Sequence, residues 1–307
     1  MSPVPSHVST TRGPVLIIGT GLLGTSLALA LRSEGVEVFL RDSSPTAGRL
    51  AQDLGAGTLI GPDDHCSPSL VIVSTPPDVA DICVVDALIR YPEAVVSDVA
   101  SVKLAVLEGV VEEAERRGLD ITSRYVGSHP MAGRERSGAG AADADLFYGR
   151  PWVIVPSPTS APDAVMRIRS LAGDVGAFPI EMDASTHDQS VALISHVPQL
   201  VSSMLAARLA DAPVSALSLS GQGLRDTTRI AASDPRLWTA ILAGNAGPVV
   251  KVLKDIRGDL DDLISHLDAA AQEGPLEGGS VGAVYRVMDQ GNRGVARIPG
   301  KHGGAPR

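Results

Sequence analysis

The sequence predicts an α/β protein, a Rossmann-type doubly wound sheet followed by an all-α helical dimerisation domain. Apolar runs of strand length alternate with helix-like segments up to residue 182, a pattern typical of a parallel sheet with helices on both faces. A glycine-rich turn follows the first apolar run, and from Asp183 onward only helical patterns remain. We therefore expect a disordered leader at residues 1–13, a Rossmann-type domain at 14–182, a helical domain at 183–272 and a flexible tail at 273–307.

The composition is that of an ordinary globular protein. The chain has 307 residues, of which 44% are hydrophobic and only 3% aromatic, so we expect an aliphatic core built from small side chains. A formal net charge of -9 argues against nucleic acid as the main partner. The N-terminus lacks a signal-type apolar run and no long uninterrupted apolar segment follows, which predicts a cytoplasmic protein that binds no membrane. Cys66 and Cys83 lack metal-ligand spacing, and no metal site is expected.

The first strand and helix carry a dinucleotide-binding pattern. The apolar run at residues 14–18 leads directly into GTGLLG, and the helical segment SLALALRSE follows. In such a unit the glycines allow a tight turn and a close approach to a pyrophosphate, which the helix N-terminus stabilises. The pattern therefore predicts cofactor contacts from Gly19, Thr20, Gly21, Leu22, Leu23 and Gly24.

An acidic residue after the second predicted strand, residues 36–40, indicates which dinucleotide binds. Asp42 lies 23 residues beyond Gly19, close to the spacing at which a carboxylate accepts the 2′-hydroxyl of the adenosine ribose. A carboxylate there would repel the extra phosphate of NADP, so we expect NAD. NADP is the alternative, because the guanidinium of Arg41 could hold a 2′-phosphate if it turned inward.

Two later strand ends bring polar residues to the same edge of the sheet. One apolar run stops at Ser74, Thr75 and Pro76, which we expect along the nicotinamide half of the cofactor; an ordinary proline-stopped strand is the alternative. Another is followed by SDVASVK, in which Ser101 either caps the next helix or meets a polar substrate. The other elements expected are helices at 46–54, through 89, up to 118 and at 163–171, and strands near 58 and at 70–73, 94–96, 121–125, 152–155 and 177–181.

The stretch VGSHPMAGRERSG, residues 126–138, places one histidine among glycines and a proline. Such a loop is preset for a tight turn, and an imidazole with a pKa of about 6.5 can accept a proton at neutral pH. We therefore expect His129 to be an acid-base group in a cleft, with a surface histidine at a strand end as the alternative. Residues 134–148 have the composition of a mobile loop that could act as a lid.

The helical domain begins with a long apolar helix at residues 183–211, in which Pro198 should introduce a kink. Few charges lie in its middle, so we expect burial on more than one face and a part in an oligomer interface. Because buried polar groups need partners, a purely structural role for His187 and His196 is an open alternative.

Two arginines follow beside flexible glycines. Residues 221–229 are GQGLRDTTR, and the guanidinium groups of Arg225 and Arg229 could bind a carboxylate in a bidentate fork. One of them could instead pair with Asp226 or Asp234. Ser233-Asp234-Pro235 then opens a helix that carries Trp238, and a last helix with a solvated charged face is expected at 247–271.

Four motifs together resemble the prephenate and arogenate dehydrogenase family of tyrosine biosynthesis, and the likeness covers about residues 14–270. They are SDVASVK at 97–103, GSHPMAG at 127–133, HD at 187–188 with SHVP at 195–198, and RDTTRIA at 225–231 followed by SDP and Trp238. The resemblance implies a Rossmann-type domain, a helical domain that forms a homodimer, and an active site between them.

The reaction implied by this resemblance is an oxidative decarboxylation. Hydride passes to NAD from the ring carbon that bears the 4-hydroxyl, carbon dioxide leaves C1, and the ring becomes aromatic. By the same resemblance His129 accepts a hydrogen bond from the 4-hydroxyl, Ser101 holds that hydroxyl, and Arg229 binds a substrate carboxylate. The other substrate-site residues implied are Ser195, His196, Gln199, Asp226 and the loop residue Glu135.

Two features depart from the family pattern. Some prephenate-using relatives have His-Leu-Pro-His where this chain has His-Val-Pro-Gln at 196–199. Gln199 can donate and accept hydrogen bonds, so the choice between prephenate, which has a keto group, and arogenate, which has an amino group, stays open. Residues 297–304 resemble the segment that precedes a regulatory domain in longer relatives, and we expect no tyrosine feedback through such a domain.

Two other functions fit parts of the pattern. A β-hydroxyacid dehydrogenase would share the two-domain plan, but it relies on a lysine of the helical domain, and Lys251 and Lys254 lie on a helix predicted to face solvent. A non-catalytic NAD-binding sensor would keep the fold without the chemistry. The joint presence of His129, Ser101 and Arg229 disfavours a sensor, which would be identified by NAD binding without turnover.

Overall fold

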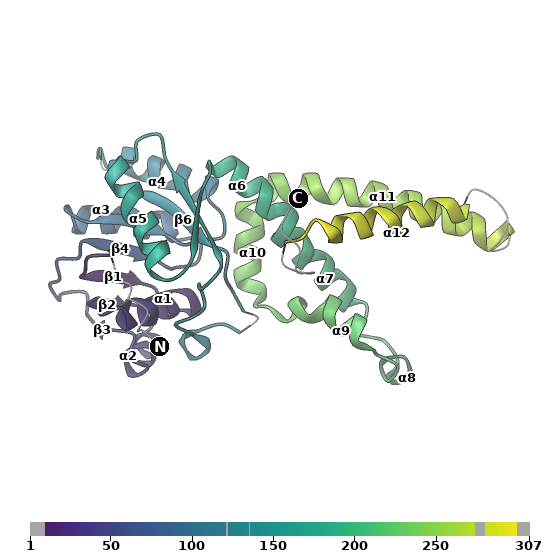
Figure 1. The fold of residues 1–307 in the computed structure, drawn as a ribbon, viewed down its shortest axis with the longest axis horizontal. Coiled ribbons are helices and arrows are strands. Elements are labelled where there is room, and N and C mark those ends of the chain that lie inside the picture. The colour runs from purple at the N-terminus through teal and green to yellow at the C-terminus, as the bar shows by residue number, and fades with distance from the viewer. Residues whose placement is uncertain (1–9, 121, 135, 274–279, 300–307) are drawn as a thin grey trace, which may run out of the picture. The chain divides into compact units, whose positions relative to one another are not determined.

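The structure is a computed structural model that describes residues 10–120, 122–134, 136–273 and 280–299 (Figure 1). The chain divides into two compact units, residues 1–249 and 250–307. The boundary falls inside one long helix, α11 (Ala246–Glu273). The first unit contains the sheets, the predicted cofactor turn and all the motifs that suggested chemistry.

The centre of the first unit is a parallel five-stranded sheet in the order β3-β2-β1-β4-β5. The central strand pairs with a neighbour on each side, Val15 opposite both Val38 and Leu70. This order is the Rossmann order 3-2-1-4-5-6 without its last strand, and ligands of that fold bind beyond the carboxyl ends of the strands. The strands are β1 (Val15–Ile18), β2 (Val38–Arg41), β3 (Thr58–Leu59), β4 (Leu70–Val73) and β5 (Val95–Asp98).

Alternate side chains of these strands enter two separate cores. Val15 and Ile17 pack on one face with Leu27 and Ile168, whereas Leu16 packs on the other. Because both faces are covered, the strands are apolar throughout, as in other parallel sheets. The first core receives α1 (Leu22–Ser33), α2 (Pro45–Asp53) and α5 (Pro162–Asp174), and the second receives α3 (Ala80–Arg90) and α4 (Leu104–Arg116).

A second, three-stranded sheet follows in the order β6-β7-β8, with β6 (Val126–Pro130), β7 (Pro151–Pro156) and β8 (Phe178–Glu181). The expected strand at 121–125 was wrong: Thr122–Arg124 is a single 3-10 turn, and the strand is the following glycine-containing stretch. An isolated parallel bridge between Val96 and Tyr125 links the two sheets. His129 therefore lies on a strand, opposite Val153, and not in a loop.

Most of the segment expected as a mobile lid, residues 136–148, is anchored to the rest of the unit. It contains a 3-10 turn at Ala139–Ala141, and Leu146 and Phe147 are buried. The backbone N–H of Asp143 donates to Ser26 Oγ of α1 at 3.0 Å. Sequence composition missed this anchoring because the apolar residues are few and separated by alanines and glycines.

The long apolar helix is interrupted one turn before the expected place. It consists of α6 (Ala184–Val191), a π-helical segment (Ala192–His196) and α7 (Val197–Ala207). Pro198 has no N–H to donate to the preceding turn, and a widened turn accommodates that loss. By length and mean hydropathy the stretch Ala184–Ala207 could cross a membrane, although polar residues interrupt it, and 33% of its most apolar window is buried in the structure.

The remaining helices are α8 (Val214–Leu217), α9 (Gln222–Thr228), a 3-10 turn at Arg229–Ala232, α10 (Pro235–Gly244), α11 and α12 (Ser280–Ala296). The flexible tail expected at 273–307 was wrong for α12, where apolar residues such as Val284 and Val287 recur at helical spacing between the glycines. The disordered leader was wrong for its last residues, since Thr10 and Thr11 both donate backbone hydrogen bonds to Asp174.

Candidate active site

The glycine-rich turn lies between β1 and α1 and touches the end of β4. Gly19 has a φ of +97°, and a Cβ there would lie 2.4 Å from the carbonyl oxygen of Ser74. A Cβ on Gly24 would lie 2.0 Å from the carbonyl oxygen of Gly19. Gly21 is different, because a Cβ there would meet nothing within 4 Å. The first and third glycines are thus required by the protein's own backbone, whereas the second faces the space that a pyrophosphate would enter.

Asp42 lies at the end of β2 and holds the same turn. One of its oxygens accepts from the backbone N–H of Thr20 at 2.6 Å and from Thr20 Oγ1 at 2.7 Å, and the other accepts from the Ser44 N–H at 2.7 Å. A carboxylate has about four acceptor positions, so one is left for a ribose hydroxyl. The rest of the predicted cofactor set is near by in the fold: Leu22 and Leu23 begin α1, and Ser74, Thr75 and Pro76 directly follow β4.

Arg41 is directed to other partners. Its Nη1 donates to the Tyr91 hydroxyl at 3.0 Å and its Nη2 to the Gly61 carbonyl at 3.2 Å. The guanidinium is therefore engaged away from the Asp42 carboxylate, and the inward-turned Arg41 that would favour NADP is not the arrangement in the structure.

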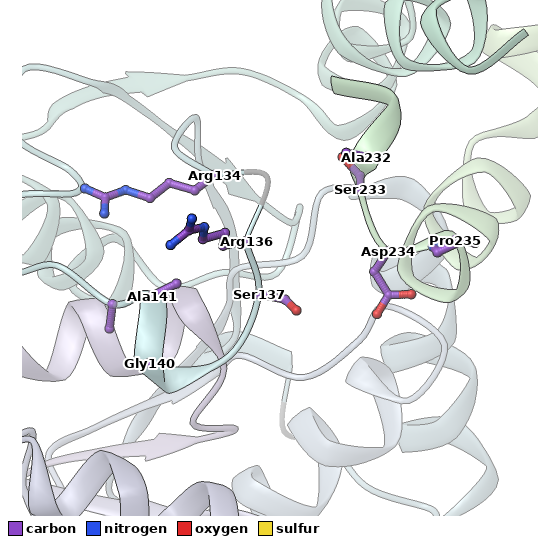
Figure 2. A pocket seen from close by; sticks show the side chains of 10 residues that line it. Arg134, Arg136, Ser137, Gly140, Ala141, Ala232, Ser233, Asp234 and Pro235 are labelled. Carbon is purple, nitrogen blue, oxygen red and sulfur yellow. The ribbon is translucent and has the colours of Figure 1, made fainter. Parts of the chain in front are cut away.

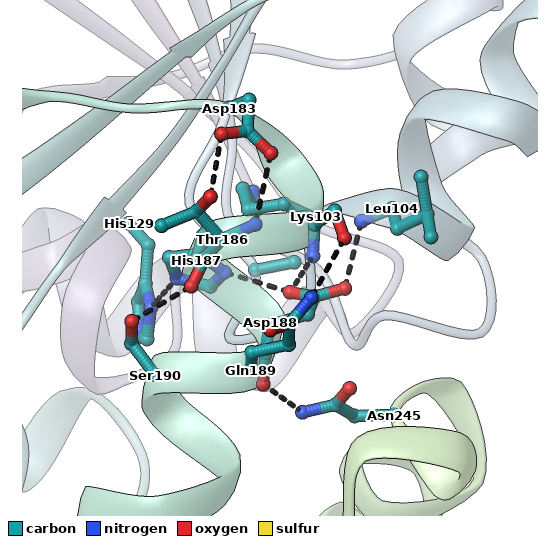
Figure 3. Close-up of polar contacts among 12 residues, drawn as sticks. Lys103, Leu104, His129, Asp183, Thr186, His187, Asp188, Gln189, Ser190 and Asn245 are labelled. Atoms are coloured by element: carbon teal, nitrogen blue, oxygen red, sulfur yellow. Dashed lines mark hydrogen bonds and ion pairs between the residues drawn. The ribbon is translucent and has the colours of Figure 1, made fainter.

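His129 is almost fully buried, with 8% of its surface exposed. Its Nδ1 lies 2.8 Å from His187 Nε2, and His187 Nδ1 lies 2.7 Å from Asp188 Oδ1 (Figure 3). Since a carboxylate only accepts, His187 donates from Nδ1, and the Nε2 of neutral His187 then accepts from His129 Nδ1–H. This assignment leaves His129 Nε2 as the unprotonated nitrogen, which can accept a proton from a substrate.

Asp188 is held by the N-terminus of α4. Its two oxygens accept the backbone N–H groups of Lys103 and Leu104, each at 2.9 Å. A helix N-terminus stabilises a carboxylate. Asp188 of α6 therefore caps α4, a role that the sequence suggested for Ser101. Ser101 makes no side-chain cap of α4 and lies in the loop between β5 and α4.

A buried cation lies beside this chain of hydrogen bonds. Lys103 Nζ pairs with Asp98 and donates to the Ser128 carbonyl at 2.7 Å, while the Tyr125 hydroxyl donates to the other Asp98 oxygen at 2.7 Å. Burial lowers the pKa of Lys103, although its pairing with Asp98 opposes that effect. The ion pair ties β5 to the strand that carries His129.

The electrostatic surroundings keep His129 neutral. Burial lowers its pKa well below the usual value, and the nearby His187, Lys103 and His196 lower it further. His196 is also buried, and burial lowers its pKa to about 4. Its Nδ1 lies 3.0 Å from Asn245 Nδ2, which also donates to the Asp188 carbonyl at 2.7 Å, so His196 accepts and carries its proton on Nε2.

Gln199 and Ser202 hold the backbone around the 3-10 turn that begins at Arg229. Gln199 Nε2 donates to the Ile230 carbonyl at 2.9 Å, and Ser202 Oγ donates to the Thr227 carbonyl at 2.8 Å. Gln199 is 5% exposed. The structure therefore shows it as a support of this turn, and the direct substrate contact expected from the sequence stays a prediction. Ser195 lies half-buried in the π-helical segment.

The two arginines of the expected clamp have separate surroundings. Arg225 Nη2 donates to the Ser220 carbonyl at 3.1 Å, within its own helix region, and Arg229 begins the 3-10 turn with an exposed side chain. Asp226 accepts from Gln222 at 2.8 Å. Only Arg229 is thus placed by the Gln199 and Ser202 contacts, and Glu135 lies outside the described residues.

A cavity of about 1050 Å³ separates the loop after β6 from the start of α10 (Figure 2). Arg134 and Arg136 line it on one side, and Ala232 and Asp234 line it on the other. Arg134 forms an ion pair with Asp143. Residues 232–235 of its lining directly follow the Arg229 turn in the chain. The cavity has room for a small charged substrate, and His129 does not line it.

The comparisons with known proteins fit this arrangement. Residues 27–181 match the family model described as prephenate dehydrogenase, nucleotide-binding domain, and residues 183–277 match prephenate dehydrogenase, dimerization domain. The chain belongs to the prephenate dehydrogenase family. The predictions of family, fold class and dehydrogenase function are confirmed by these matches.

Several relatives of this prephenate dehydrogenase family member show how wide the family is. A probable prephenate dehydrogenase of Streptomyces niveus, NovF, is 36% identical over 94% of this chain and 78% of its own length. The structure of A. aeolicus prephenate dehydrogenase in complex with hydroxyphenyl propionate and NAD+ has a TM-score of 0.78 at 25% identity, covering 94% of this chain and 99% of that one. Synechocystis arogenate dehydrogenase has a TM-score of 0.71 at 27% identity, covering 92% and 98%.

Sequence reasoning missed two residues of the site. Asn245 and Tyr125 make contacts that no local pattern reveals, because their partners lie 57 and 27 residues away. The His187-Asp188 pair was visible as a motif, and its adjacency to His129 was the missing information. Among the described residues, no cluster suited to a metal ion occurs.

Proposed function

We propose that the protein catalyses the oxidative decarboxylation of prephenate to 4-hydroxyphenylpyruvate with transfer of hydride to NAD, a step of tyrosine biosynthesis. The observation that carries this proposal is the buried His129, whose Nε2 is left unprotonated by the hydrogen bond to His187. Relatives named prephenate dehydrogenase share its fold along most of the chain. Arogenate is the alternative substrate, as in the Synechocystis relative.

The cofactor is NAD, held by the turn at residues 19–24 and by Asp42. The open space beside Gly21 fits a pyrophosphate, and the acceptor position left on Asp42 fits the ribose 2′-hydroxyl. The guanidinium of Arg41 is hydrogen-bonded to Tyr91 and is therefore not directed to bind the 2′-phosphate of NADP. When bound, NAD supplies the hydride acceptor. We assign Ser74, Thr75 and Pro76 to the border of its site.

His129 performs the proton transfer. As the hydride leaves C4, the proton of the 4-hydroxyl moves to His129 Nε2, which is kept neutral by burial. When carbon dioxide leaves C1, the electron pair of the broken bond completes the aromatic ring, and the proton returns to the ring oxygen. No net proton is released. General acid-base catalysis of this kind contributes about 100- to 10,000-fold to a rate.

The remaining substrate contacts are assigned by the motifs and by position. Arg229 binds a substrate carboxylate. The loop that contains Ser101 follows β5, and Asp98 at the end of β5 pairs with Lys103, which is bonded to the strand that carries His129. Ser101 holds the 4-hydroxyl beside His129. The other assigned residues are Ser195, His196, Asp226 and Glu135, with Gln199 acting through the Arg229 turn.

The proposed assembly is a homodimer formed through the helical domain, in the cytoplasm, without a nucleic acid or membrane partner. The matched family domain is a dimerization domain. Leu193, Ile194 and Met204 are each at least 62% exposed in the single chain, on the apolar stretch that begins the domain. Burial of such a surface between two copies would explain its hydropathy, because large exposed apolar patches mark interfaces.

The deciding experiment measures reduced nicotinamide formation by the purified protein, crossing prephenate and arogenate against NAD and NADP. We expect turnover with prephenate and NAD, and His129→Asn should lose most of kcat while NAD affinity stays unchanged. Turnover of arogenate alone would replace the proposed substrate. NAD binding without turnover of either compound would identify a sensor and contradict the proposal.

A further inference from the structure

We propose that His187 and Asp188 are positioning residues that fix His129 as its Nδ1–H tautomer and stabilise the charge that develops on its ring. This proposal rests on the proposed function, in which His129 takes a proton at Nε2. Its geometry stands independently, since the three side chains lie in one hydrogen-bonded row (Figure 3).

The row joins two parts of the fold that are far apart in sequence. His129 lies on β6, whereas His187 and Asp188 are neighbours on α6, 58 residues further along the chain. All three are buried: His187 is 0% and Asp188 is 2% exposed. Buried polar side chains with short, directed contacts have little freedom to adopt another arrangement, so the row specifies which nitrogen of each ring carries the proton.

Asp188 is well suited to anchor the row as an anion. It accepts the N–H groups of Lys103 and Leu104 at the start of α4, where the positive end of the helix dipole faces it. An ionised Asp188 can only accept, which forces the proton of His187 onto Nδ1. Each step along the row then fixes the next, ending with a free lone pair on His129 Nε2.

The same row stabilises the protonated ring during turnover. When His129 Nε2 takes the hydroxyl proton, the positive charge is shared through the Nδ1–H bond to His187, whose other side faces the Asp188 carboxylate. His187 itself, Lys103 from the β5–α4 loop and His196 from the π-helical segment all lower the pKa of His129 and so oppose its cation. Asp98 is paired with Lys103. Asp188 is therefore the carboxylate that the row connects to His129.

The most informative substitution is Asp188→Asn. An amide can donate from its nitrogen to His187 Nδ1, which would move the His187 proton to Nε2 and make His129 carry its proton on Nε2 as well. The base would then be blocked although every ring stays in place. The equivalent change in a serine protease triad costs about 10,000-fold in kcat, and we expect a loss of at least about 100-fold here.

A pair of substitutions at His187 separates acceptor chemistry from packing. His187→Leu removes the acceptor, whereas His187→Gln retains an oxygen that can accept from His129 Nδ1–H. We expect His187→Leu to lose about 100-fold or more in kcat and His187→Gln to be at least about tenfold faster than it. Equal rates for the two variants, or a His187→Leu enzyme within about threefold of wild type, would overturn the proposal.

The full-length protein also allows a test without turnover. In ¹⁵N NMR spectra of histidine side chains, His129 should be protonated at Nδ1 in the wild type and at Nε2 in Asp188→Asn; a wild-type His129 protonated at Nε2 would overturn the proposal. Asp183→Asn is the matched control, because Asp183 is exposed, caps the start of α6 and lies outside the row. It should leave kcat unchanged. Melting temperature and NAD affinity identify any variant that fails to fold, and the two His187 variants keep the test decisive if Asp188→Asn does fail.

The NMR result also separates this proposal from the proposed function. If the wild type did not oxidise prephenate, the proposed substrate would be wrong, and the NMR spectra would still test which nitrogen of His129 carries the proton. Turnover by the wild type together with unchanged kcat in Asp188→Asn would retain the function and reject the role of the row.

Discussion

Gln199 Nε2 donates to the carbonyl oxygen of Ile230 at 2.9 Å, one residue beyond Arg229. Three residues along α7, Ser202 Oγ binds the Thr227 carbonyl on the other side of Arg229. The two side chains therefore hold the backbone of the proposed carboxylate-binding residue from both sides. We therefore expect Gln199 to affect substrate binding indirectly, by fixing the position of Arg229.

Replacement of Gln199 by alanine should weaken substrate binding more than it slows chemistry. The substitution leaves the Ile230 carbonyl without its partner and loosens the turn, at a cost of about 1–3 kcal/mol. We expect KM for prephenate to rise about tenfold while kcat stays within about threefold. Steady-state kinetics checks this, with Gln189→Ala on the exposed side of α6 as the control. A large loss of kcat with unchanged KM would instead place Gln199 at the reacting atoms.

Removal of the guanidinium itself should have a larger effect on binding. Arg229→Ala is expected to raise KM for prephenate at least about 100-fold, since charge-assisted bidentate hydrogen bonds are among the strong ones. Arg229→Lys should recover only part of the loss, because an ammonium cannot form the two-pronged contact. Arg225→Ala is the comparison, as Arg225 binds the Ser220 carbonyl. If Arg225→Ala raised KM as strongly as Arg229→Ala, both arginines would belong to the substrate site.

Much of the fold was predictable because it depends on local patterns. The strand before GTGLLG, the helix after it and the acidic residue after the second strand all follow from spacing along about 30 residues of chain. The second sheet was harder to predict. His129 lies on a strand whose partner, Val153, pairs from 24 residues away (153 − 129), and its glycine and proline weigh against a strand in any local reading.

The site was predictable as a set of motifs but not as a network. His187 and Asp188 stood out as a pair, yet only folding shows that Asp188 caps α4 and that His187 reaches His129. The contact of Gln199 with the Arg229 turn was not predictable for the same reason: its partner, the Ile230 carbonyl, is a backbone atom, and a residue pattern does not show backbone contacts.

The glycines of the cofactor turn should fall into two classes. In Gly21→Ala the new methyl group meets no protein atom within 4 Å, and the φ of -70° suits alanine, so the protein should fold normally and lose NAD affinity. In Gly24→Ala the methyl group would lie 2.0 Å from the Gly19 carbonyl oxygen, so the fold itself should be destabilised. Thermal melts and NAD titrations distinguish the two. A Gly21→Ala protein with unchanged NAD affinity would show that the cofactor does not approach this turn.

Stability should fall as the pH is lowered from about 6.5 toward 4. Burial lowers the pKa of His196 from 6.5 to about 4, while the Asp188 carboxylate opposes that effect and His187 adds to it. Between these values the unfolded chain binds a proton that the folded protein does not, so acidification favours unfolding. The neutral His196 is matched to its neighbours, since its Nδ1 accepts from Asn245 and its ring packs edge-on against Trp238.

Thermal melts at a series of pH values test this expectation. The loss attributable to His196 is up to about 3 kcal/mol at pH 4, because its pKa falls from 6.5 to about 4. His129 adds to this loss in the same direction, because its pKa is also lowered. His196→Gln, which can keep a hydrogen bond to Asn245, should flatten the dependence between pH 6.5 and 4 relative to wild type. Carboxylates with lowered pKa values, such as Asp143 and Asp183, act below their ordinary pKa of 3.8 and therefore outside most of this window. A His196→Gln protein with the same pH dependence as wild type would show that His196 titrates normally in the folded state.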